Sequence, residues 1–239
     1  MKKFFLILSS LLLVVFSCGK NENGNRGHNN QGEGDGPITI DGSFEDWMNL
    51  DGAYIVKNAP NSMWDAVKEL RVYASGDYVY YYIRFDREVI SEYLDQNDKL
   101  PARVNLNTDG EFTSGYENYF LQAYDFIIEL SLGNGAGGWG SADDSSLLQR
   151  IDGTWVDLLG ENSGLTFGQG SGYEFELFVD RTIFNRAAVA STVPMPMGDT
   201  FQTSMRFYET VSDPHWAELA NIPNSDEGYG NLLEVTFAE

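Results

Sequence analysis

Residues 70–86 read LRVYASGDYVYYYIRFD, and their pattern decides the fold class. Leu70, Val72 and Ala74 take every second position before a turn at residues 75–77. After the turn, apolar side chains again occupy alternate positions, at Val79, Tyr81, Ile83 and Phe85. A period of two is typical of a β-strand with one buried face, and two such runs joined by a short turn predict an antiparallel hairpin.

The same alternation recurs along the rest of the chain. Further strands are predicted at residues 102–107, 124–132, 147–151, 154–158, 173–179, 201–207 and 233–237. Helical signals are confined to residues 43–49, 88–94 and 181–188, the last with Asp180 as its N-cap. Parallel sheets need long helical crossovers, which this pattern lacks. We therefore expect an all-β fold, an antiparallel β-sandwich of immunoglobulin or jelly-roll type with a few short helices.

Residues 1–17 have the pattern of a lipoprotein signal peptide. Lys2 and Lys3 precede an apolar run over residues 4–16, which is shorter than the ~20 residues that a membrane helix needs. Cys18 is the only cysteine and directly follows the small Ser17, as in a lipobox, so lipidation of Cys18 is predicted. A plain secretory signal with an accidental cysteine is the alternative. Glycine after the cysteine favours the outer membrane, on its periplasmic or cell-surface face.

With residues 1–17 as a signal peptide, the chain divides into three parts. Residues 18–36 are rich in Gly, Asn and charged side chains and have no large apolar residue, which predicts a flexible tether. Residues 37–239 are expected to form one β-sandwich domain. The whole chain has 42% hydrophobic and 14% aromatic residues, enough to build a core.

The charge of the chain excludes some classes of partner. Its formal net charge is −21, and removing Lys2 and Lys3 with the signal peptide would make it more negative. Such a field repels phosphate backbones and anionic lipids, so we expect no nucleic-acid partner and membrane contact only through the lipid anchor. An acidic surface suits divalent cations and neutral sugars.

Several motifs in chain order resemble family 9 carbohydrate-binding modules and their DOMON-like relatives. These motifs are residues 38–47 (ITIDGSFEDW), the hairpin at 70–85, residues 105–110 (NLNTDG), residues 124–129 (YDFIIE), Trp216, and residues 230–235 (GNLLEV). The resemblance covers most of residues 37–239 and implies a β-sandwich that binds carbohydrate, with an acidic loop at the end of a strand. In the first motif, Trp47 is expected to pack in the core.

The acidic loop is a candidate calcium site. Oxygen-bearing side chains at alternate positions, followed by glycine, are how a calcium loop surrounds its ion. Asn105, Asn107 and Asp109, followed by Gly110, have this spacing, and the further candidate ligands are Glu111, Glu117 and Asp125. Tyr116 stands where an EF-hand needs an acid, so an EF-hand is excluded. A structural calcium site and an ordinary turn held by Asn and Asp side chains both remain open.

Three tryptophans are candidate sugar-binding residues. Sugar rings stack on flat aromatic faces, while amides and carboxylates bind their hydroxyl groups. Trp139, Trp64 and Trp216 each lie in a segment without a strand pattern, where local packing is the alternative role.

Enzymatic motifs are missing from the sequence. It has two histidines, no Gly-x-Ser-x-Gly elbow, no His-Glu-x-x-His pair and no phosphate-binding loop. We therefore expect a lipid-anchored cell-envelope protein with a noncatalytic carbohydrate-binding β-sandwich, which calcium would brace. The alternative is a structural or adhesive surface lipoprotein that binds another protein and no sugar.

Overall fold

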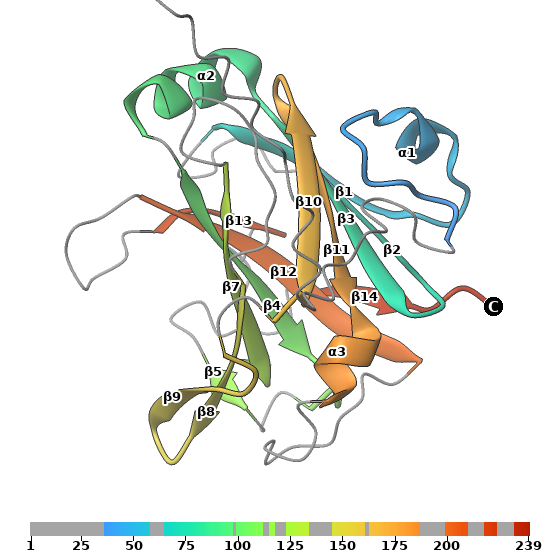
Figure 1. Ribbon diagram of the computed structural model, residues 1–239, viewed down its shortest axis with the longest axis vertical. Coiled ribbons are helices and arrows are strands. Elements are labelled where there is room, and N and C mark those ends of the chain that lie inside the picture. Colours follow the sequence, from blue (N-terminus) through green and yellow to red (C-terminus); the bar gives the residue numbers. More distant parts are fainter. Residues whose placement is uncertain are drawn as a thin grey trace, which may run out of the picture. The chain divides into compact units, whose positions relative to one another are not determined.

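The computed structural model describes residues 36–57, 65–97, 99–111, 115–117, 123–133, 145–160, 163–186, 199–209, 218–223 and 232–239. These residues belong to one compact unit, Gly32–Glu239. They form two main antiparallel sheets and three short helices (Figure 1). The all-β antiparallel sandwich expected from the sequence is thereby confirmed. The described helices include none with the length and apolar character needed to cross a membrane.

The first sheet has five strands in the order β1–β2–β3–β11–β10. Their bounds are β1 (Tyr54–Lys57), β2 (Val67–Ser75), β3 (Tyr78–Phe85), β11 (Glu174–Asp180) and β10 (Thr166–Ser171). The hairpin predicted from residues 70–86 is the pair β2–β3, with Leu70 opposite Ile83 and Val72 opposite Tyr81.

The second sheet has seven strands in the order β13–β12–β4–β7–β8–β9, with β14 also paired to β12. Their bounds are β13 (Glu218–Ile222), β12 (Thr200–Tyr208), β4 (Leu100–Asn107), β7 (Phe126–Leu132), β8 (Ser146–Ile151), β9 (Thr154–Asp157) and β14 (Leu233–Thr236). The turn between β8 and β9 is Asp152-Gly153, where both residues have positive φ, as a type I′ hairpin turn requires. A two-stranded ribbon pairs β5 (Tyr116–Glu117) with β6 (Ala123–Tyr124).

The main core lies between the two sheets. Phe85 at the end of β3 packs edge-on against Phe207 near the end of β12, with ring centroids 5.5 Å apart. Near the middle of the same strands, the hydroxyl groups of Tyr81 and Thr203 form a buried hydrogen bond of 3.1 Å. These contacts fix which ends of the two sheets coincide.

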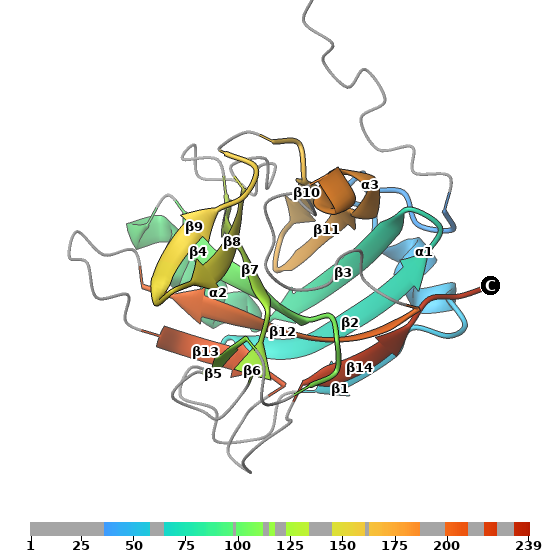
Figure 2. The same ribbon diagram turned by 90° about the horizontal axis from the view of Figure 1, so that it is seen from below.

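The C-terminal strand links the sheets at the opposite end. The backbone N–H of Ala238 donates to the carbonyl of Ala74 on β2 at 2.8 Å, and that of Thr236 donates to the hydroxyl of Tyr54 on β1 at 3.1 Å. Figure 2 shows β14 beside β1 and β2 at this end.

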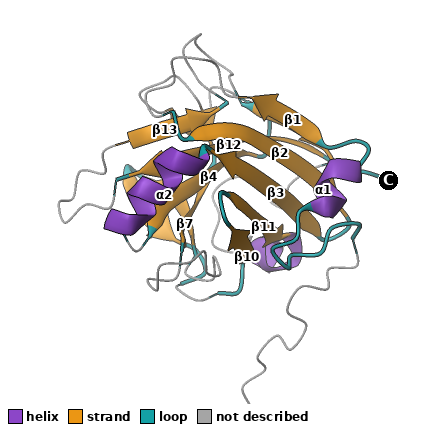
Figure 3. Cartoon of the chain, turned by 90° about the horizontal axis from the view of Figure 1, so that it is seen from above, coloured by secondary structure: helices purple, strands orange, loops and turns teal. Residues whose placement is uncertain are grey.

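A second apolar layer covers the outer face of the first sheet. The N-terminal segment, residues 36–50, includes α1 (Glu45–Asn49), which Figure 3 shows beside the first sheet. Its side chains Ile38, Ile40 and Trp47 pack with Tyr80 and Tyr82. Trp47 is fully buried, as expected for a core residue. Both faces of β3 are therefore inside the protein.

Glu176 on β11 anchors this N-terminal segment. Its side chain has no exposed surface and accepts hydrogen bonds from the backbone N–H groups of Asp41 (3.0 Å) and Gly42 (2.8 Å). It also accepts one from the indole N–H of Trp47 at 2.9 Å. Gly42 has a φ of 80°, a conformation that glycine adopts readily, and the chain bends at Asp41 and Gly42.

The remaining helices connect strands. Helix α2 (Arg87–Gln96) joins β3 to β4, and Asp86 caps it by accepting from the N–H groups of Glu88 and Val89. Helix α3 (Arg181–Arg186) follows β11 directly. Its predicted cap is confirmed, since Asp180 accepts from the N–H groups of Thr182 and Ile183.

Candidate ligand-binding face and strand-end loop

Two of the tryptophan-bearing segments adjoin the same end of the second sheet. Strands β7 and β12 lie on either side of β4 and both run antiparallel to it. Their last residues therefore lie where β4 begins, an end we call the upper end as it is drawn in Figure 1. The segment from β7 to β8 contains Trp139, and the segment from β12 to β13 contains Trp216.

The third segment adjoins the upper end from the first sheet. Trp64 lies between β1 and β2, and Val67 at the start of β2 pairs with Phe85. Because Phe85 contacts Phe207, the start of β2 also belongs to the upper end. All three tryptophans lie outside the described residues, and so does Cys18. The structure thus brings together the strand ends that flank the three segments.

A polar face lies on the outer side of the second sheet, close to the upper end. It consists of Arg103, Asn105, Glu129, Ser204 and Arg206. Arg206, Arg103 and Glu129 form one row across β12, β4 and β7. Ser204 and Asn105 form the next row, in which Ile127 on β7 lies opposite Asn105. The opposite side chains of these strands, such as Val104 and Met205, fill the main core.

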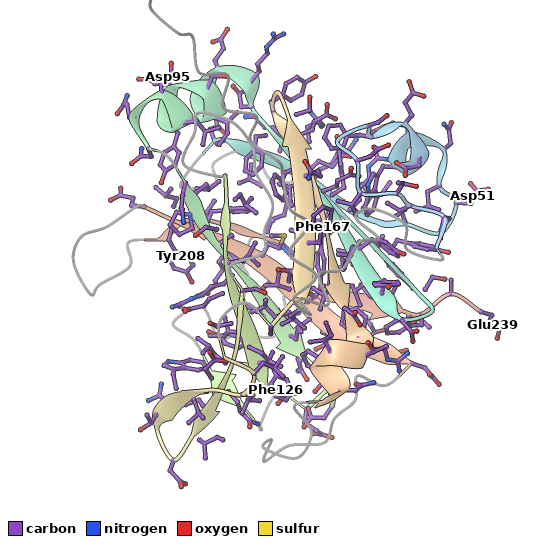
Figure 4. The ribbon with its side chains drawn as sticks, viewed as in Figure 1. Asp51, Asp95, Phe126, Phe167, Tyr208 and Glu239 are labelled. Atoms are coloured by element: carbon purple, nitrogen blue, oxygen red, sulfur yellow. The ribbon has the colours of Figure 1, made fainter. Side chains whose placement is uncertain are left out.

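An ion pair lies at the centre of the first row. The Nε of Arg103 donates to Oε1 of Glu129 at 2.8 Å, and its Nη2 contacts the same oxygen. Nη1 of Arg103 donates to the hydroxyl of Tyr208 at 3.4 Å, and the guanidinium carbon lies 4.9 Å from the centre of the Tyr208 ring. Figure 4 shows Tyr208 near the end of β12. Burial works against the charge of Arg103, yet Tyr208 and Glu129 more than offset it and raise the pKa of Arg103.

The second row is more deeply buried. Asn105 and Ser204 have no exposed surface, and Nδ2 of Asn105 donates to Oγ of Ser204 at 2.9 Å. The other amide atom of Asn105, Oδ1, is buried without a hydrogen-bond partner. The structure therefore places Asn105 in the sheet, with its amide bound to β12.

The candidate calcium ligands Asn107, Asp109 and Asp125 lie around a loop at the end of β4. Oδ1 of Asn107 accepts from the N–H of Gly110 at 2.9 Å, and Oδ1 of Asp109 accepts from the N–H of Glu111 at 2.8 Å. These are the bonds of an ordinary Asn/Asp turn. Oδ2 of Asp125 accepts from the N–H and the hydroxyl of Thr108, at 2.8 and 3.0 Å.

Asp125 nevertheless has a feature that suits a cation. Its Oδ1 is buried without a partner, and burial, together with the nearby charge of Asp109, raises the pKa of Asp125 despite its bonds to Thr108. The described residues contain no group of three or more His, Cys, Asp or Glu side chains placed to hold a metal. The side chain of Glu117 lies outside the described residues. Among the described candidates, Asp125 and Asp109 could supply two oxygen ligands to a calcium ion.

Four residues around the polar face were missed as candidates from the sequence. These are Arg103, Glu129, Arg206 and Tyr208. The alternation of 201–207 does turn Arg206 away from the core, but an outward charge is usually solvated. Arg206 is buried because its neighbours come from strands that are distant in sequence, and the alternation does not reveal such neighbours.

Comparison with known proteins leaves the family open. No family model matches the chain, and no curated protein matches it. The likeness to family 9 carbohydrate-binding modules therefore stays a resemblance of short motifs.

Proposed function

We propose that the protein is a lipid-anchored cell-envelope protein whose β-sandwich binds glycans without transforming them. The observation that carries the proposal is the polar row Arg206–Arg103–Glu129, close to the end where three tryptophan-bearing segments adjoin the sandwich. Guanidinium and carboxylate groups bind hydroxyl groups in a plane, and indole rings stack on the C–H faces of sugars. The two kinds of group would thus act on one ligand.

The signal pattern supports the anchor part of the proposal. Lipid on Cys18 and a tether over residues 18–36 would hold the domain at the outer membrane, on its periplasmic or cell-surface face. Replacing Cys18 with serine should move the protein from the membrane fraction to the soluble fraction of a bacterial host. Equal membrane retention of both proteins would contradict lipidation.

Calcium fits the proposal as a structural ion. Asp125 and Asp109 would hold it at the end of β4, where it would neutralise two neighbouring carboxylates. The ion would brace the loop at the end of β4 and would take no part in chemistry.

Retention on immobilised polysaccharides tests glycan binding. We expect the mature protein to be retarded in gels that contain at least one of a panel of plant, algal and bacterial polysaccharides. Trp139→Ala and Trp216→Ala should each weaken this retardation, and Trp64→Ala should add to the effect. Trp155→Ala is a matched control, because Trp155 pairs with Arg150 near the turn of the β8–β9 hairpin, away from the upper end.

Two outcomes would refute the proposal. One is a folded wild-type protein that shows no saccharide affinity at millimolar concentration. The other is retention that Trp155→Ala weakens as much as Trp139→Ala and Trp216→Ala do.

A further inference from the structure

The N-terminal segment lies on the outer face of the first sheet without joining it. None of residues 36–50 belongs to a strand, and their buried apolar side chains form a cluster of their own with Tyr80 and Tyr82. The main core between the two sheets contains no member of this cluster. The segment can therefore leave the sheet without opening the main core.

The polar contacts between the segment and the sheet converge on Glu176. Its carboxylate accepts from the backbone N–H groups of Asp41 and Gly42 and from the indole N–H of Trp47. Among the described residues, one further hydrogen bond joins the segment to the sheet, from Nη1 of Arg71 to the carbonyl of Trp47 at 2.7 Å. Three of these four hydrogen bonds thus end on one titratable side chain.

The sheet brings no close cation to Glu176. Its neighbours in the row across the sheet are Tyr82 on β3 and Gln169 on β10, and neither is a cation. Arg71 on β2 lies beyond Tyr82, with its guanidinium carbon 5.5 Å from the centre of that ring, and it pairs with a carboxylate on its own strand. Glu174, two residues away on β11, is a second acid and accepts from the hydroxyl of Tyr82.

The segment itself makes ionisation of Glu176 less favourable. It covers the carboxylate and adds the acidic side chains of Asp41 and Asp46. Burial, with a smaller contribution from the charge of Asp46, raises the pKa of Glu176 to about 7 from its ordinary 4.5, although the N–H groups of Gly42, Trp47 and Asp41 act against the rise. When the segment leaves the sheet, water reaches Glu176 and its pKa returns towards 4.5. The detached form therefore becomes more favourable as the pH rises.

The two pKa values limit the size of this effect. Below pH 4.5 Glu176 is protonated in both forms, and well above pH 7 it is ionised in both. Between these limits the ratio of detached to attached segment rises by up to about 300-fold, since each pH unit contributes a factor of ten. The attached form remains the major one, because detachment exposes the buried side chains Ile38, Ile40 and Trp47.

We propose that the N-terminal segment is a pH-dependent strap between the lipid anchor and the sandwich, which Glu176 holds closed in acid and loosens as the solution becomes alkaline. The predicted tether, residues 18–36, ends where the segment begins. A detached segment of fifteen residues would lengthen the connection to Cys18 by up to ~50 Å. The role as a joint rests on the proposed lipid anchor, whereas the detachment itself needs no lipid.

Hydrogen exchange of the full mature chain, followed by NMR between pH 5 and 8, tests the inference. Rates are corrected for the intrinsic exchange rate at each pH, so that protection reports opening of the structure. The amides of Asp41 and Gly42 should lose protection by up to about 70-fold from pH 5 to pH 8. They should also be less protected than the amides of β4 and β12 at every pH, because the segment opens without global unfolding.

Glu176→Gln removes the titrating group, and Glu174→Gln is the matched control on the same face of β11. Protection of Asp41 and Gly42 should be constant from pH 5 to pH 8 in Glu176→Gln and should fall as in the wild type in Glu174→Gln. A fall of the wild-type size in Glu176→Gln overturns the inference. If Glu176→Gln does not fold, the wild type decides. Constant protection of Asp41 and Gly42, or protection equal to that of β4 and β12, then overturns the inference.

Fractionation and polysaccharide gels separate this failure from failure of the proposed function. A lipidated, glycan-binding protein whose segment keeps constant protection overturns the strap alone. Equal membrane retention of the wild type and Cys18→Ser overturns the role as a joint, even if the segment detaches as expected. A wild-type protein that binds no polysaccharide overturns the glycan proposal and leaves the pH-dependent strap in place.

Discussion

Replacing Glu176 with glutamine should remove a pH-dependent part of the stability of the protein. Burial raises the pKa of Glu176 to about 7 from its ordinary 4.5, although the N–H groups of Gly42, Trp47 and Asp41 stabilise the ionised form. The folded state thus holds this proton to a higher pH than the unfolded chain does. The stabilisation is complete below pH 4.5 and is lost as the pH rises through 7.

The two pKa values set an upper limit for the effect. The difference between about 7 and 4.5 corresponds to at most about 3 kcal/mol in the free energy of unfolding. Glutamine cannot ionise, but its nitrogen would face one of the three donors that the carboxylate now accepts. Leaving the indole N–H of Trp47 unpaired in this way costs about 1–3 kcal/mol at every pH.

Urea unfolding of both proteins between pH 4.5 and 8 measures this difference. Tryptophan fluorescence is a suitable signal, because the indole of Trp47 is bonded to Glu176. The wild type should be the more stable protein at pH 4.5, and its advantage over Glu176→Gln should shrink by up to about 3 kcal/mol by pH 8.

Glu174→Gln is the control for the general loss of a negative charge. Glu174 lies two residues from Glu176 on the same face of β11 and binds the hydroxyl of Tyr82. Repulsion among the many carboxylates also grows with pH, but it acts on all three proteins alike. A constant difference between wild type and Glu176→Gln across this range would refute the reasoning.

Two further predictions concern the loop at the end of β4. Gly115→Ala should lower the free energy of unfolding by about 1–3 kcal/mol in urea titrations, because φ is 73° and the new Cβ would lie 2.5 Å from the carbonyl oxygen of Tyr124. Gly76→Ala, with open space around its Cβ, should cost less, and equal costs would contradict the crowding. Excess calcium should raise the melting temperature, by an amount equivalent to ~2.7 kcal/mol at 100 times the Kd. The shift should vanish in Asp125→Asn, and no shift in the wild type would argue against the calcium site.

The alternation in the sequence predicted the main core but not the second layer. Val79, Tyr81, Ile83 and Phe85 fill the core as expected. Tyr80 and Tyr82 are equally buried, because residues 36–50 cover the other face of β3. A period of two identifies the two faces of a strand, but it does not tell which segment will cover the second one.

Strand β10 shows why some elements were missed. Its sequence, TFGQGS, contains two glycines, which normally interrupt strands. A Cβ at Gly168 would lie 2.7 Å from the ring of Phe175 and 2.9 Å from the carbonyl oxygen of Glu176. The glycine therefore permits a close approach of β10 to β11, and that need appears only in the folded structure.

The polar face was unpredictable because its strands are distant in sequence. The alternation within residues 201–207 indicates that Gln202, Ser204 and Arg206 share a face. It could not show that β12 lies beside β4, almost a hundred residues earlier, or that Arg206 faces Arg103. The loop at the end of β4 was easier to predict from the sequence, since Asn107 and Asp109 are close in sequence. Asp125 joins them because its N–H donates to the carbonyl of Leu106, at the break between β6 and β7.

The link between the C-terminal residues and the first sheet has a practical consequence. Ala238 is bound to β2 at the end of the sandwich remote from Tyr208, and Glu239 extends beyond it (Figure 4). A linker fused after Glu239 would attach the protein to a sensor chip from the end of the sandwich remote from the upper end. Immobilisation by this route would leave the glycan-binding surface proposed here accessible to large polymers.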